Sequence, residues 1–269
     1  MATSDSRRQP LLLGPYKGAL EGGLAQTRRK NTEPMKWNEV FCHTFKALRR
    51  QIEPETRKRV ELMLPSMPMV EACRAMDFDC FKPFIAAGKL TEQQMHHAAD
   101  RYHLGKTKSG QPIYWMIDDM QNPLDAHIGG GWISTLLKKR EPILDFWQVT
   151  HCLFGLHLTT DQSKPIAIVE REEAAVVLSE LFPESIWLAY ATNAHLQPGL
   201  LAPLQGRTVT IYPRTDPTLS NYVFFEEYVA KVRQQFDIDL HVDTTLEDHA
   251  TAEQKSRCID ILEFLIDSL

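Results

Sequence analysis

The sequence predicts an α/β fold with a mostly parallel sheet, and three observations carry that prediction. Short apolar runs with the composition of buried strands lie at 165–169, 186–191, 208–212 and 238–243. Segments with apolar residues at helical spacing interleave with them, at 171–182, 221–236 and 251–268. The first strand passes directly into a helix, as in the βα unit of a parallel sheet. We therefore expect a mostly parallel sheet of four strands with right-handed crossovers.

The preceding residues predict three further parts, so that the chain divides at 1–34, 35–100, 101–160 and 161–269. The first part is rich in glycine and positive charge and is expected to be a flexible basic arm. The second is helical, with Thr91 as an N-cap. The third contains a β-hairpin, with strands at 111–118 and 124–128, and an apolar connecting helix at 143–158.

The charge is distributed unevenly along the chain. The net charge is −5, but residues 1–60 hold 13 Lys and Arg against 6 Asp and Glu, whereas residues 161–269 hold 8 against 18. This distribution is compatible with a basic arm that binds nucleic acid and an acidic body that binds a divalent ion. Charged residues on solvated helix faces would give the same distribution. The candidates for contact with a polynucleotide backbone are Arg28, Arg29, Lys30, Arg49, Arg50, Lys138, Lys139 and Arg140.

Several classes of protein are not expected. No apolar run approaches the roughly 20 residues of a membrane helix, and the N-terminal apolar patch is too short for a secretory signal, so we expect a cytoplasmic protein without membrane contact. The five cysteines form no CxxC pair, which argues against zinc. His96, His97 and His103 lack the HExxH pattern and are typical of a helix surface.

Acidic residues follow the predicted parallel strands at the ends where ligands bind in open α/β sheets. Glu170 follows the first strand, Asp216 the third and Asp243 the fourth. Because the carboxyl ends of parallel strands share one edge, Glu170 and Asp216 are expected to meet there although they are far apart in sequence. An acid at the start of a helix can also serve only as a cap, so for Glu170 both roles stay open.

The order of these motifs resembles that of a known domain. Ile168-Val169-Glu170, a helix and a later acidic strand end resemble the Toprim domain of bacterial primases, topoisomerases and nucleases. Over about residues 100–269 the chain is more closely similar to an uncharacterised Toprim-like family of bacterial conjugative transposons and other mobile genetic elements. The matching motifs are Tyr102 to Thr107, Ile113 to Asp118, Cys152 to Gly155 with His157, Lys164 to Glu170, Ser185 to Ala189 and Gly206 to Pro213.

The resemblance implies roles for three residues. In Toprim enzymes a glutamate after the first strand is the general acid or base, and an Asp-x-Asp after a later strand holds Mg²⁺. By position, Glu170 is that glutamate and Asp216 is the second aspartate, so both are expected as catalytic and metal-binding residues. Arg214 replaces the first aspartate, and a guanidinium near Mg²⁺ is repelled by about 4 kcal/mol at intermediate dielectric. Asp243 can restore a metal ligand.

Two functions follow from the replacement by Arg214. If Arg214 grips phosphate directly, the chain is a mobile-element protein that engages DNA or RNA, with primase-like or nuclease-like phosphodiester chemistry at a degenerate acidic site. If the site has decayed, the chain is an inactive Toprim-like scaffold that binds replication or conjugative-transfer proteins. A small-molecule enzyme of doubly wound type is less consistent with the sequence, because GxGxxG, GxSxG and P-loop motifs are missing.

Overall fold

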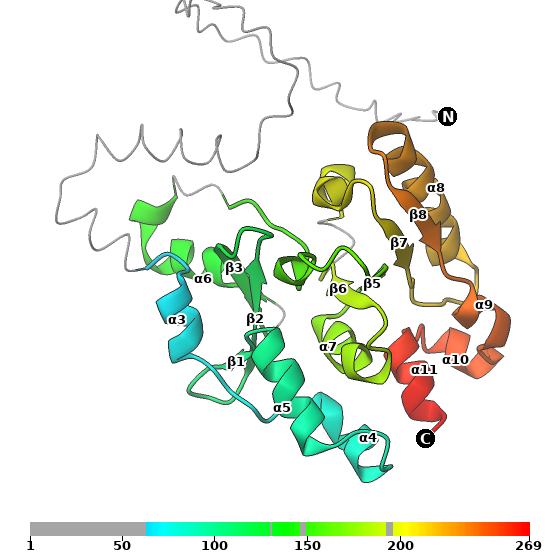
Figure 1. The fold of residues 1–269 in the computed structure, drawn as a ribbon, viewed down its shortest axis with the longest axis horizontal. Helices are drawn as coiled ribbons and strands as arrows, with labels where there is room; N and C mark the ends of the chain where they lie inside the picture. Colours follow the sequence, from blue (N-terminus) through cyan, green and yellow to red (C-terminus); the bar gives the residue numbers. More distant parts are fainter. Residues whose placement is uncertain (1–62, 130, 146–148, 192–195) are drawn as a thin grey trace, which may run out of the picture. The chain divides into compact units, whose positions relative to one another are not determined.

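The computed structural model describes residues 63–129, 131–145, 149–191 and 196–269. The chain divides into Met1–Ile52 and Glu53–Leu269, and every described residue belongs to the second of these units (Figure 1). The predicted basic arm and the first half of the predicted helical region therefore lie outside the described residues. The division into four parts that the sequence predicts stays a prediction.

The parallel sheet predicted for the C-terminal half is confirmed. Its four strands are β5 (Ile166–Val169), β6 (Ile186–Ala189), β7 (Thr208–Ile211) and β8 (Asp239–Val242). They pair in parallel in the order β6-β5-β7-β8, with Ile166 opposite both Ile186 and Val209. All four begin and end within two residues of the ranges that the apolar runs predict, because buried parallel strands are apolar on both faces.

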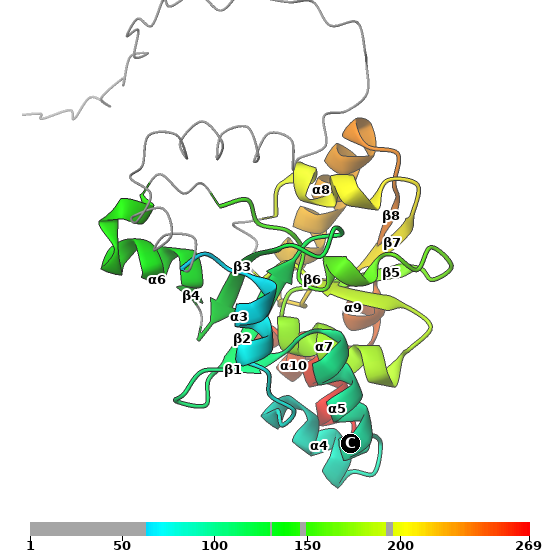
Figure 2. The same ribbon diagram turned by 60° about the vertical axis from the view of Figure 1, so that its left-hand side comes forward.

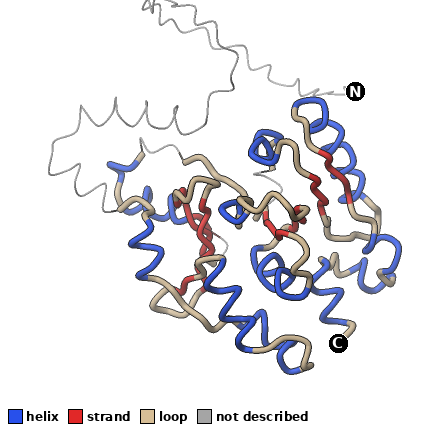
Figure 3. Tube along the Cα trace, in the orientation of Figure 1, coloured by secondary structure: helices blue, strands red, loops and turns tan. Residues whose placement is uncertain are grey.

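Two helices cover opposite faces of this sheet. Alternate residues of β5 point to opposite sides, so Ala167 and Val169 pack in the core that contains α7 (Glu172–Leu181). Ile166 and Ile168 pack in the second core, which contains α8 (Ser220–Gln235) and the 3-10 segment Pro198–Leu204. Figures 1 and 3 show α7 and α8 on either side of the strands. The connections after β5 and β7 therefore leave the sheet toward different faces.

The predicted hairpin is the centre of a second, antiparallel sheet. Its strands are β1 (Gly105–Lys106), β2 (Pro112–Ile117), β3 (Pro123–Ile128) and β4 (Gly131–Trp132), paired in that order. Asp118 holds the turn between β2 and β3, since its Oδ1 accepts hydrogen bonds from the backbone N–H groups of Met120 and Asn122. The hairpin is thus confirmed.

The remaining helices are short. They are α3 (Met67–Ala72), α4 (Lys82–Ala86), α5 (Glu92–Arg101), α6 (Ile133–Arg140), α9 (Thr245–His249), α10 (Ala252–Ser256) and α11 (Ile261–Asp267), with a 3-10 turn at Asp79–Phe81. Thr91 caps α5 as predicted, in a capping box with Gln94. Figure 2 shows α5 beside α7, against which it packs. None of the helices within the described ranges is both long and apolar enough to cross a membrane.

Two helix predictions are wrong. The apolar stretch 143–158 forms 3-10 turns at Pro142–Leu144 and Leu156–Leu158 where it is described, and Gly155 has a φ of 82° that an α-helix cannot contain. The predicted helix at 251–268 is divided into α10 and α11. Cys258, with a φ of 51°, ends the first, and Asp260 starts the second through a capping box with Glu263.

Arg207 fixes the connection that leads into β5. Its residue is 8 % exposed, and its guanidinium donates hydrogen bonds to three backbone carbonyls. These are the carbonyls of Thr159 at 3.0 Å, Asp161 at 2.9 Å and Lys164 at 2.7 Å. Because Arg207 directly precedes β7, this clamp ties the entry of β5 to the entry of its neighbour.

Replacing Arg207 should therefore destabilise the sheet. Arg207→Met leaves those carbonyls without their donor, and we expect the free energy of unfolding in urea to fall by about 3 kcal/mol. Arg257→Met is the matched control, because Arg257 is half exposed and pairs with Asp267 at the surface; a loss within about 1 kcal/mol is expected there. Equal losses in the two variants would contradict the role of the clamp.

Candidate functional site at the carboxyl edge of the parallel sheet

The strand order places a topological switch point between β5 and β7. The chain leaves β5 toward α7 on one face and leaves β7 toward α8 on the other. In open α/β sheets, ligands bind beside the carboxyl ends of the strands at such a point. The residues that follow β5 and β7 are thus the first place to search for a functional site.

Glu170 and Arg214 meet at this switch point. Arg214 Nε lies 3.1 Å from Glu170 Oε2, and the two side chains are 34 % and 20 % exposed. The two atoms form an ion pair and not a hydrogen bond. Both are buried, and neither makes a hydrogen bond to another described residue. The structure thus brings together two of the three catalytic residues that the sequence predicts.

The carboxyl of Glu170 is affected mainly by its burial. Burial raises the pKa of its carboxyl above the ordinary value of 4.5, and the charge of Arg214 opposes that shift only in part. The charges of Asp260, Arg171 and Glu172 act on it more weakly. A carboxyl with a raised pKa holds and releases its proton closer to neutral pH, as an acid or base catalyst must.

Asp216, the third predicted catalytic residue, is occupied at the start of α8. Its Oδ1 accepts hydrogen bonds from the backbone N–H and the hydroxyl of Thr218 and from the N–H of Ser220, and its Oδ2 accepts one from the N–H of Asn221 at 2.7 Å. Although burial opposes the shift, these bonds lower the pKa of Asp216 to about 2. Asp216 therefore caps the first N–H groups of α8 from outside the helix, whose N-cap residue is Leu219.

The predicted metal ligands do not fit Mg²⁺ as they are arranged here. Glu170 faces a guanidinium, Asp216 directs both oxygens to the start of α8, and Asp243 Oδ1 accepts a hydrogen bond from the N–H of Thr245 at 2.9 Å. A hard divalent cation needs several converging oxygen atoms. Within the described ranges, no group of three or more His, Cys, Asp or Glu side chains has a metal-binding arrangement.

The C-terminal helices close over this edge of the sheet. Thr215, next to Arg214, is fully buried, and its hydroxyl donates to Glu247 Oε1 on α9 at 2.8 Å. Glu247 in turn accepts a hydrogen bond from Lys255 Nζ of α10 at 2.9 Å. The backbone N–H of Thr215 also donates to the carbonyl of Ile259. These contacts fix the backbone that presents Arg214.

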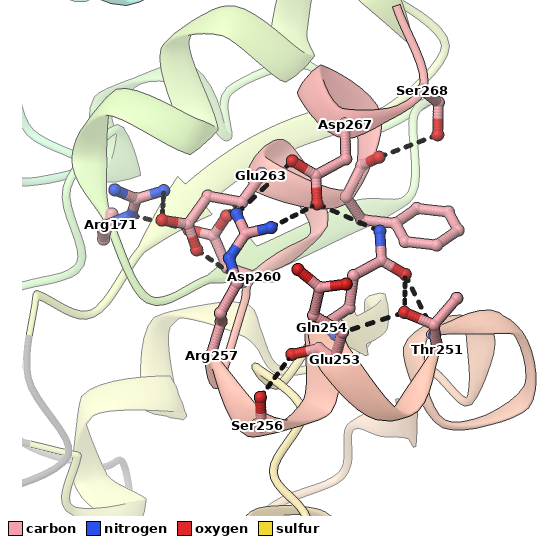
Figure 4. A network of polar contacts seen from close by, with 11 residues as sticks. Arg171, Thr251, Glu253, Gln254, Ser256, Arg257, Asp260, Glu263, Asp267 and Ser268 are labelled. Atoms are coloured by element: carbon pink, nitrogen blue, oxygen red, sulfur yellow. Dashed lines mark hydrogen bonds and ion pairs between the residues drawn. The ribbon is translucent and has the colours of Figure 1, made fainter.

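Arg171 makes the corresponding contact from the other side of the switch point. Figure 4 shows its guanidinium directed at two acids of α11: Nε lies 2.6 Å from Asp260 Oδ2, and Nη2 lies 3.7 Å from Glu263 Oε1. Asp260 is almost fully buried and also caps α11. This pair fixes the residue that follows Glu170, so the backbone on each side of the Glu170–Arg214 pair is held by the C-terminal helices.

The predicted nucleic-acid contacts are only partly described. Lys138, Lys139 and Arg140 form the last turn of α6, where positive charge also stabilises the helix dipole. That helix packs on β3 of the antiparallel sheet. The other five candidates lie outside the described residues: Arg28, Arg29, Lys30, Arg49 and Arg50.

Two carboxylate–histidine pairs were missed by the sequence reasoning. His151 Nε2 lies 2.9 Å from Oδ2 of the fully buried Asp125, and His127 Nδ1 lies 2.9 Å from Glu172 Oε1 at the start of α7. The Trp132 ring contacts both histidines, with centroids at 4.0 Å from His151 and 5.2 Å from His127. Alternation along the predicted strand at 124–128 could have placed Asp125 and His127 on one face.

Comparison with known proteins identifies a family but no activity. A family model described as a domain of unknown function, DUF6371, matches residues 81–215, which is half of the chain. The matched stretch includes Glu170 and Arg214 and ends one residue before Asp216. No curated protein and no solved structure matches the sequence, so the Toprim-like and mobile-element resemblance stays a prediction. The chain belongs to the DUF6371 family.

Proposed function

We propose that this chain is a Toprim-like protein that engages DNA or RNA at the carboxyl edge of its parallel sheet. Arg214 holds a phosphate group of the nucleic acid, and Glu170 acts as the general acid or base at that phosphodiester. The observation that carries the proposal is the 3.1 Å contact between these two residues at the switch point. A guanidinium offers fixed donors that match phosphate oxygens, and the raised pKa of Glu170 suits acid or base catalysis.

In this proposal Arg214 supplies the positive charge that Mg²⁺ supplies in the Toprim domains that the sequence resembles. A phosphate that binds Arg214 takes the place of Glu170 as its counter-ion, so the ion pair keeps the guanidinium oriented until a ligand arrives. Participation of Mg²⁺ would require Asp216 to leave the start of α8 and give up its backbone hydrogen bonds. Binding without a divalent ion is therefore the simpler expectation.

The second candidate function is an inactive scaffold for replication or transfer proteins of a mobile element. The engagement of Asp216 as a helix cap favours it, because a carboxylate with that role is not available for chemistry. The two candidates differ in what Glu170 does. Only the first requires the proton-transfer role of Glu170 and the anion-binding role of Arg214.

Opposite substitutions of the ion pair should change oligonucleotide affinity in opposite directions. In the full-length chain without divalent ions, Arg214→Ala should weaken binding about tenfold, which is about 1.4 kcal/mol, since it removes the phosphate contact. Glu170→Gln should strengthen binding by a similar factor, because Arg214 loses its competing counter-ion. Fluorescence anisotropy with a labelled single strand measures both, and Arg257→Ala is the control for loss of one positive charge.

The pH dependence provides a second test of the same contact. Below the raised pKa of Glu170 the carboxyl is neutral and releases Arg214, so wild-type affinity should rise as the pH falls from 7 toward that pKa. The Glu170→Gln variant should lack this rise in affinity. Arg214→Ala has no guanidinium to release, so its pH profile is subtracted from that of each protein to isolate the contribution of the ion pair. Weaker binding by Glu170→Gln at every pH would show that the carboxylate, and not the guanidinium, is the ligand-binding group.

Chemistry at Glu170 can be tested separately from binding. We expect nicking or primer-synthesis activity, assayed with and without Mg²⁺ or Mn²⁺, to disappear in Glu170→Gln and to persist in Glu226→Gln, which changes an exposed acid on α8. An active enzyme with the same rate in both variants would eliminate the role of Glu170. If no activity is detected and calorimetry finds no Mg²⁺ binding that depends on Glu170, the scaffold function is favoured.

The basic arm should add a salt-dependent contribution to binding. Replacing Arg28, Arg29 and Lys30 by alanine in the full-length chain removes up to three phosphate contacts. The slope of log affinity against log salt concentration should then become shallower by about 2 for a single strand, since each contact contributes about 0.7. Arg49 and Arg50 can be tested in the same way, and an unchanged slope would remove the arm from the binding surface.

A further inference from the structure

Three neighbouring strands of the parallel sheet are each followed by a polar residue at the carboxyl edge. The register pairs Val169 of β5 with Ala189 of β6, so the next residues, Glu170 and Tyr190, are neighbours. The backbone N–H of Tyr190 continues the ladder by donating to the carbonyl of Val169. Alternation along the strands directs Glu170 and Tyr190 toward the α8 side. Arg214 joins them from the end of β7.

Each of these side chains has a buried polar atom without a hydrogen-bond partner. Within the described part of the chain, the atoms are Tyr190 Oη, Glu170 Oε2 and Arg214 Nε. Three other described side-chain atoms share this property, on Trp115, His157 and Glu172, and that of Glu172 is ion-paired with His127. Glu170 Oε2 and Arg214 Nε face each other as an ion pair at 3.1 Å, whereas Tyr190 Oη has no polar partner at all. Buried polar groups are normally satisfied, so the Tyr190 hydroxyl beside this ion pair needs an explanation.

Tyr190 is the least accessible of the three. It is 3 % exposed, and its ring packs against Phe225 of α8 with centroids 5.8 Å apart. Burial, with a smaller contribution from the charge of Glu170, raises the pKa of its hydroxyl, so the group keeps its proton and is available as a donor. A buried hydroxyl without a partner destabilises a folded chain, whereas phenylalanine would fill the same space without that cost. A ligand that accepts its hydrogen bond would account for the tyrosine.

We propose that Tyr190 and Arg214 together bind a terminal phosphate, the phosphomonoester at the end of a strand or on a single nucleotide. This inference rests on the proposed function and specifies its ligand. A phosphomonoester has three non-bridging oxygens, enough to accept hydrogen bonds from both the phenol and the guanidinium. The depth of Tyr190 favours a small terminal group over the backbone of a duplex. Arg214, one-third exposed, is the part of the site that solvent reaches.

The test compares oligothymidylates that differ only at their ends. Strands with a 5′-phosphate, a 3′-phosphate or two hydroxyl ends are bound to the full-length chain, and inorganic phosphate is used as a competitor. For the wild type, one of the two terminal phosphates should raise affinity about tenfold over the hydroxyl-ended strand. Tyr190→Phe should lose most of that gain and still bind the hydroxyl-ended strand normally. Tyr228→Phe, at another buried tyrosine of the same core, should retain the gain.

The stability of Tyr190→Phe separates a ligand-binding role from a structural one. Loss of an unpartnered buried hydroxyl should leave the thermal unfolding midpoint unchanged or raise it. Equal affinity for all three strands in the wild type would overturn the inference, as would a Tyr190→Phe variant that unfolds earlier and keeps the preference. The proposed function would survive both results if Arg214→Ala still weakens binding of the hydroxyl-ended strand, and it would fail if that variant binds normally.

Discussion

The central place of β5 between two parallel neighbours is the constraint on which the rest of the structure depends. β5 is hydrogen-bonded to β6 on one side and to β7 on the other, and the ladder continues past the strand ends. The Arg207 clamp fixes the start of this arrangement. Tyr190 and Arg214, which follow Glu170 by 20 and 44 residues in the sequence, are thereby brought close to it.

The charge balance at this edge differs from that of a two-carboxylate metal site. The permanent positive charge of Arg214 lies beside Glu170, while Asp216 accepts hydrogen bonds from the start of α8. A guanidinium is weakly hydrated for a cation and binds oxygens in a fixed geometry. Burial keeps the pKa of Glu170 high even so. The ligand that we propose for this edge is accordingly an anion.

The C-terminal helices contact the backbone and side chains at this edge through polar groups. α9 and α10 hold Thr215, and α11 holds Arg171, so the backbone next to each member of the ion pair is fixed by buried or half-buried polar contacts. These helices lie beyond the stretch that the family model matches. The separation of α10 from α11 at Cys258 is what allows Asp260 to cap one helix and pair with Arg171 at the same time.

The sequence by itself determined the elements, and the tertiary structure decided the partners. Apolar runs and helical spacing predicted the parallel strands, the hairpin and the cap at Thr91, because burial and capping depend on residues close together in the chain. The same patterns misread 143–158 and missed the break at Cys258, where a left-handed backbone interrupts an apolar helical pattern. The place of Glu170 after a predicted strand marked it as a candidate, and the resemblance to Toprim domains marked Arg214. The contact between them, the diversion of Asp216 to a cap and the position of Tyr190 followed only from strand order and register, which join residues that local periodicity cannot relate.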